Sequence, residues 1–172
     1  MDFSLLHPKL VHFPLALAVL VPLFASGIAV AWWRKKLSRQ VWWIALAMQS
    51  LLVISGFAAM QAGESAEHRV ESVVAENIIE EHAEGAELFV WVATAATIPF
   101  FLAAFIKKES LALVLSGAAV VGSCVVLALA IRAGGSGGAL VYEHGAANAY
   151  MGANAGASGP ATEAAGDADD DD

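Results

Sequence analysis

Residues 10–36 read LVHFPLALAVLVPLFASGIAVAWWRKK, an apolar run that ends in two tryptophans and three bases. A helix rises about 1.5 Å per residue, so roughly 20 apolar residues cross a hydrocarbon core about 30 Å thick. Four runs are long enough: 10–33, 41–62, 86–106 and 111–131. With 58% hydrophobic residues and a mean hydropathy of +0.64, the chain is predicted to be all-α, a four-helix transmembrane bundle.

The charges predict how this bundle is oriented. The two short connectors, RKKLSRQ at 34–40 and KKE at 107–109, contain six bases and one acid, whereas the rest of the chain contains three bases and sixteen acids. Positively charged loops stay in the cytoplasm, so both termini are predicted to lie on the outer side. The predicted location is the cell (inner or plasma) membrane, which the chain crosses several times. The pairs Trp32–Trp33 and Trp42–Trp43 are predicted to lie at the cytoplasmic headgroup layer.

Two segments on the outer side have distinct compositions. Residues 63–85 are polar with apolar residues at helical spacing, which predicts an amphipathic helix over the outer mouth of the bundle. After 131 comes a glycine-rich connector and a short apolar patch that folds back on the outer surface. We expect a transmembrane domain over 1–147 and a disordered acidic tail over 148–172.

All five histidines fall on the predicted outer side. His12 is the most informative, because an ionisable residue at hydrocarbon depth is a functional candidate by default. His7 is five residues away, about 140° around a helix, so an unbroken helix cannot direct both rings at one ion. His82 opens the third run and His144 follows the fourth, whereas His68 lies in a charged, solvated stretch.

Three functions fit these histidines. Two imidazoles from different helices can hold a b-type haem for electron transfer, with His12 and His82 as the first choice of axial pair and His7 and His144 as substitutes. A copper or zinc site is the second alternative; it would use His7, His12, His82, His144 and Glu64. In the third, the chain is a non-catalytic accessory subunit of a membrane redox complex and its histidines satisfy buried backbone groups.

Other chemistries find little support in the sequence. Cys124 is the single cysteine, which excludes an intramolecular disulfide and covalent CxxCH haem attachment. The sequence contains no GxSxG motif, no P-loop and no paired transmembrane carboxylates, so no catalytic residue is assigned. We expect the lipid bilayer and a redox partner on the outer face as partners, leave a homo-oligomer open, and expect no nucleic acid.

The stretch HPKLVHFPLAL at 7–17, the glycines Gly56 and Gly63, His82, and the stretch GGALVYEHG at 137–145 resemble the prokaryotic membrane proteins of the domain of unknown function 2231 family. The resemblance covers roughly residues 5–147. It implies a small four-helix membrane protein without an established activity. Members are sometimes found near, or fused to, redox modules such as Rieske domains, and this association favours electron transfer.

Overall fold

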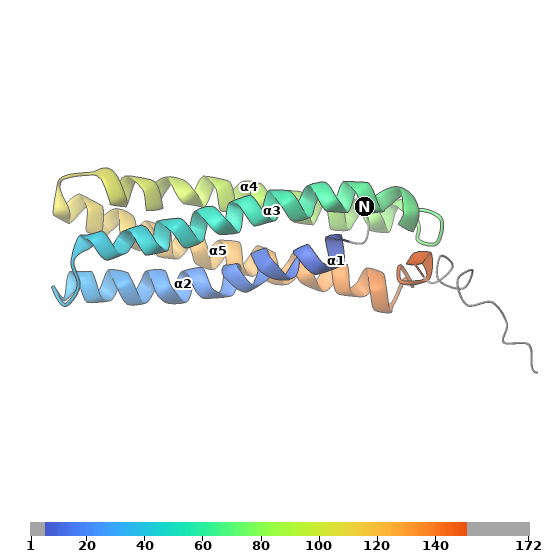
Figure 1. Cartoon of the computed structure of the whole chain (residues 1–172), viewed down its shortest axis with the longest axis horizontal. Coiled ribbons are helices and arrows are strands. Elements are labelled where there is room, and N and C mark those ends of the chain that lie inside the picture. Colours follow the sequence, from blue (N-terminus) through green and yellow to red (C-terminus); the bar gives the residue numbers. More distant parts are fainter. Residues whose placement is uncertain (1–5, 151–172) are drawn as a thin grey trace, which may run out of the picture.

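The computed structural model describes residues 6–150, in which the chain forms helices and no strand. The elements are α1 (His7–Leu10), α2 (His12–Trp33), a 3-10 helix (Arg39–Val41), α3 (Trp42–Val70), α4 (Glu76–Phe105) and α5 (Glu109–Tyr142). The four long helices run up and down as one elongated bundle (Figure 1). Four helical segments in this part of the chain are long and apolar enough to cross a membrane, which confirms the predicted four-helix fold.

The long helices form a ring in which α2 packs on α3 and α5, and α4 packs on the same two helices. Large apolar side chains such as Ile54, Ile98 and Val121 point outward and are exposed. Many fully buried positions are alanines instead: Ala25, Ala45, Ala93, Ala103, Ala112 and Ala119. Small residues inside and large apolar residues outside suit a bundle whose surroundings are lipid, because lipid solvates the outer side chains and close backbone packing holds the helices together.

The prolines explain where the first helix is interrupted. Pro14 has no N–H to donate to the carbonyl of Leu10, and the break between α1 and α2 falls at Val11. Pro14 and Pro22 are buried and Pro99 is half-buried. Neighbouring helices therefore cover the backbone groups that the prolines leave unpaired, as a membrane-embedded bundle requires.

The basic end of the bundle is the end formed by residues 34–41 and 106–108. There Trp32 and Trp42 are buried, and the Trp42 and Phe100 rings stack with centroids 5.4 Å apart. Only Trp33 and Trp43 face outward. One tryptophan of each pair thus faces outward and the other inward, because consecutive helical residues point about 100° apart; the depth predicted for the two pairs stays a prediction.

Side chains from the 3-10 helix and from the first turns of α3 also stabilise this end by donating hydrogen bonds to α4. The acceptors are backbone carbonyls. As the donor residue numbers rise, the acceptor residue numbers fall, because the two helices are antiparallel. The pairs are Arg39 to Ala104, Trp42 to Phe100 at 3.0 Å, and Gln49 to Ala93 at 2.8 Å. The register between α3 and α4 is thus fixed by polar contacts as well as by packing.

The polar segment 63–85 is helical, but it does not form a separate helix over the mouth. Instead α3 continues to Val70 and α4 begins at Glu76, with only a short turn between them. Alanine and glutamate favour helix strongly, and no proline stops either helix in this stretch. The turn is held by a small apolar cluster of Val74, Ile79, Leu140 and Ala146.

The glycine-rich stretch after 131 is not a connector, because α5 continues through it to Tyr142. Packing against neighbouring helices outweighs the low helix propensity of glycine here. The apolar patch at 139–142 is the end of α5, so the prediction that this patch folds back is wrong. The chain turns only afterwards, at Gly145, whose φ is 71°, and Ala146 is buried beside Val74, Ile79 and Leu140. Most of the predicted tail, 151–172, lies outside the described residues.

Candidate functional site

A cavity of about 580 Å³ lies at the end opposite the basic end, which we call the cavity end. At this end α3, α4 and α5 extend past the start of α1 (Figure 1), so among residues 6–150 only three helices surround this part of the bundle. Residues 146–150 contribute part of the lining. Most of the lining side chains are apolar: Pro8, Met60, Ala66, Val70, Ile79, Ala83, Ala86, Leu140, Val141, Ala146 and Ala147. We call this space the histidine cavity, because His7 and His82 both line it.

His7 lines the cavity from α1 and is anchored on α3. Its Nδ1 lies 2.8 Å from the carbonyl oxygen of Ala59. The ring packs over Gly63, where an added Cβ would lie 3.0 Å from the His7 Cε1 atom. A carbonyl can only accept a hydrogen bond, so the His7 Nδ1 must carry the proton.

His82 lines the cavity from α4 and is anchored on α5. Its Nδ1 lies 2.9 Å from the Ser136 hydroxyl oxygen, and that hydroxyl donates to the Ala133 carbonyl at 3.1 Å. The ring packs over Gly137, where an added Cβ would lie 3.0 Å from the His82 Cε1 atom. Each histidine therefore occupies space that a glycine of a neighbouring helix leaves free.

The two histidines are held in matching ways. Each uses Nδ1 for its anchor, and within residues 6–150 neither Nε2 has a hydrogen-bond partner. Both rings are half-buried and line the same cavity. A neutral imidazole with its proton on Nδ1 has a lone pair on Nε2, which is the atom that ligates a metal.

Five glutamates also line the cavity, whereas its lining includes no lysine or arginine. Four of them are exposed and Glu67 is half-buried. The exposed ones are Glu64, Glu80, Glu84 and Glu87. The interior of the cavity is thus mainly apolar, and its polar border has a negative potential that attracts cations.

The other histidines lie away from this cavity. His12 is exposed at the first position of α2 and His144 is exposed after α5, and neither lines the cavity. The predicted first-choice pair, His12 with His82, is therefore not brought together, whereas the predicted substitute His7 is. Val11 itself has helical backbone angles, so His7 and His12 lie about 140° apart around a nearly continuous helix, in line with the argument that such a helix cannot direct both at one ion.

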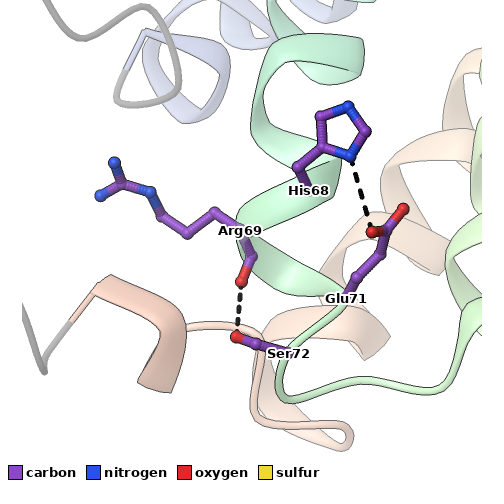
Figure 2. A network of polar contacts seen from close by, with 4 residues as sticks. All are labelled: His68, Arg69, Glu71 and Ser72. Atoms are coloured by element: carbon purple, nitrogen blue, oxygen red, sulfur yellow. Dashed lines mark hydrogen bonds and ion pairs between the residues drawn. The ribbon is translucent and has the colours of Figure 1, made fainter.

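His68 lies near the end of α3 with its side chain 90% exposed. Its Nδ1 is 3.6 Å from a carboxylate oxygen of Glu71, and the Ser72 hydroxyl donates to the Arg69 carbonyl next to it (Figure 2). The Arg69 guanidinium also lies over the ring of Tyr150, 5.6 Å from its centroid. These contacts fasten the turn and the returning segment, and His68 is solvated as predicted.

The predicted metal set of His7, His12, His82, His144 and Glu64 is only partly assembled. Three of its members, the residues His7, His82 and Glu64, line the cavity. In the part of the chain that the structure describes, no group of three or more His, Cys, Asp or Glu side chains is placed to hold a metal ion. A bound ion would need carboxylates to move toward the two imidazoles.

Sequence reasoning missed the residues that orient the two rings. Gly137 and Ser136 were interpreted as parts of a flexible connector, and the Ala59 carbonyl has no sequence signal at all. One signal was present: the run GGSGG at 134–138 follows an apolar helix with no proline, and a serine there can bond back to its own helix.

The fold and the cavity define a helical membrane protein with a ligand-sized space at one end of its bundle. The chain matches the family model described as "Predicted membrane protein (DUF2231)" over residues 4–150, and it belongs to that family. No curated protein and no solved structure matches the chain.

Proposed function

We propose that this protein binds a b-type haem in the histidine cavity and transfers electrons, with His7 and His82 as the two axial ligands. The observation that carries the proposal is the matched state of the two imidazoles. Each is anchored through Nδ1, and neither Nε2 has a hydrogen-bond partner among the described residues, beside the same apolar space. A six-coordinate haem iron needs two such nitrogens from the protein and no cysteine.

The size and lining of the cavity support this choice. A volume of about 580 Å³ lies within the range of roughly 300–1,000 Å³ that is typical of cofactor sites, and mostly apolar side chains suit a flat macrocycle. A bound haem supplies one-electron chemistry. The protein's own contribution is to hold His7 and His82 on different helices, so that the ligand geometry depends on the bundle and not on a local motif.

The charge at the border favours a second candidate, a divalent cation such as Cu²⁺ or Zn²⁺. Five glutamates and no basic side chain line the cavity, so the carboxylates of a haem would lack a basic partner among these residues, whereas a cation would be attracted. Glu64 is the carboxylate that the sequence analysis included in the predicted metal site. The geometry supports this candidate less well, because no third ligand is in place among the described residues.

The deciding experiment is a titration of the purified protein in detergent with haem, followed by absorbance. We expect a Soret band and split bands of the reduced form, in stoichiometric amount. His7→Ala and His82→Ala should each lose this spectrum while the protein stays folded. Metal analysis after dialysis against Cu²⁺ or Zn²⁺ measures the second candidate on the same samples.

His12→Ala and His144→Ala are matched controls, because both histidines are exposed and lie outside the lining. Both should keep the wild-type spectrum. Loss of haem in His12→Ala, with retention in His7→Ala, would return the assignment to the His12–His82 pair. A colourless protein with stoichiometric metal would favour the cation, and binding of neither would favour the accessory-subunit alternative.

A further inference from the structure

The hydroxyl of Ser136 is the only side-chain group, among the described residues, that is bonded to either cavity histidine. It lies 2.9 Å from the His82 Nδ1 atom and 3.1 Å from the Ala133 carbonyl oxygen. A serine hydroxyl has one hydrogen to donate and lone pairs with which to accept. A carbonyl cannot donate, so the bond to Ala133 uses the hydroxyl hydrogen.

We propose that Ser136 is a positioning residue that keeps the proton of His82 on Nδ1 and its lone pair on Nε2, directed at the ligand. This inference rests on the proposed function for its purpose, but its geometry is independent of any cofactor. In this proposal the Ser136 hydrogen goes to the Ala133 carbonyl, so the hydroxyl oxygen accepts from the His82 Nδ1 and thereby fixes the tautomer. Gly137, the next residue, lets the ring lie against α5, so the two residues together set the ring's place and rotation.

The two proposed ligands differ in the group that holds the Nδ1 atom. His7 is held by the backbone carbonyl of Ala59, which no side-chain substitution removes. His82 is held by a side chain that can be changed without altering the helix. A hydrogen bond from the outer ring nitrogen raises the basicity of a ligating imidazole. Ser136 is therefore the position at which the sequence can adjust one axial ligand and leave the other unchanged.

The first test needs no cofactor. Nitrogen NMR of imidazole-labelled protein reports which ring nitrogen of His82 is protonated, and His82→Gln assigns the signal. We expect wild type to show one tautomer with the proton on Nδ1, Ser136→Ala to show a mixture, and Ser136→Thr to restore the wild-type state. A proton on Nε2 in wild type, or no change in Ser136→Ala, would overturn the inference.

The second test uses the haem-loaded protein. Ser136→Ala should weaken haem binding by about 10- to 100-fold, as loss of such outer partners typically does. It should also shift the midpoint potential upward, because a less basic imidazole stabilises ferric iron less. Ser136→Thr should recover both values. An unchanged affinity together with an unchanged potential would count against the positioning role.

Ser123→Ala is the matched control, since Ser123 makes the same kind of bond to its own helix, to Val120 at 2.7 Å, without contacting a histidine. It should leave the tautomer, the affinity and the potential as in wild type. The two proposals fail separately. If wild type holds the Nδ1 proton as described but binds no haem, the haem proposal fails and the role of Ser136 in orienting His82 stands.

Discussion

At the basic end of the bundle, the space between the helices is filled by aromatic rings, and side chains of α3 donate hydrogen bonds to carbonyls of α4. At the cavity end, three helices extend past the fourth, and two imidazoles keep one nitrogen each without a partner among the described residues. Both ends are built from similar helices. The first end is closed by large residues against backbone acceptors, whereas glycines at the second leave room for imidazole rings that line a cavity.

Under the proposed function, this comparison separates stability from ligand binding within one bundle. Burying Trp42 stabilises the fold, because its ring is fully covered and its N–H is satisfied. A cavity of about 580 Å³ does the opposite, since its lining forgoes packing contacts. Changes at the basic end should therefore alter stability, and changes at the cavity end should alter ligand binding.

The largest expected effect is a difference in reporter signal between the two ends of the bundle, which lie on opposite sides of the membrane in the predicted orientation. Reporter fusions after Lys36 and Lys108 should register as cytoplasmic, because the six bases of the connectors hold them there. A fusion after Tyr150 should register outside. A cytoplasmic signal at Tyr150 would reverse the two ends and place the histidine cavity on the cytoplasmic face.

Trp42→Ala should lower the free energy of unfolding by about 3–5 kcal/mol, because it removes a fully buried ring and its bond to the Phe100 carbonyl. Denaturation in mixed detergent measures the change. Trp43→Ala is the control one position away, and it should cost much less because Trp43 is exposed. Equal losses in the two variants would contradict the closed packing of this end.

Gly137→Ala and Gly138→Ala should have effects of opposite sign. At Gly137 a Cβ meets the His82 ring at 3.0 Å, so the variant should lose about 1–3 kcal/mol or displace the ring and lose haem. At Gly138 nothing lies within 4 Å, so alanine should stabilise α5 by about 0.5–1 kcal/mol. Thermal unfolding and haem titration measure both, and a stabilised Gly137→Ala with normal haem uptake is the result that this account does not allow.

His68→Ala should have the smallest effect. The pair with Glu71 is 3.6 Å apart and the imidazole is 90% exposed, so its loss should change the free energy of unfolding by less than about 0.5 kcal/mol. The haem spectrum should not change. A spectral change in His68→Ala would show that the histidine cavity is not confined to His7 and His82.

The sequence alone was enough for the parts of the fold that depend on local properties. The length and hydropathy of 10–33 and its three counterparts predict four membrane-crossing helices, because each helix must satisfy its own backbone in lipid. The ends of these runs do not match the observed helix ends, and residues 63–85 were predicted to form a separate helix that the structure does not contain. Helix ends at the membrane surface depend on turns and neighbours, which hydropathy does not report.

The sequence also selected the right kind of residue for the candidate site, but only the tertiary structure decided which histidines share it. His12 ranked above His7 because depth along a helix can be counted in the sequence. What a ring faces cannot be counted in this way, since it depends on which helix lies opposite it. Gly63, Gly137 and Ser136 contact the histidine rings only because α1 packs on α3 and α4 packs on α5. A glycine leaves space for a ring only where another helix places that ring against it.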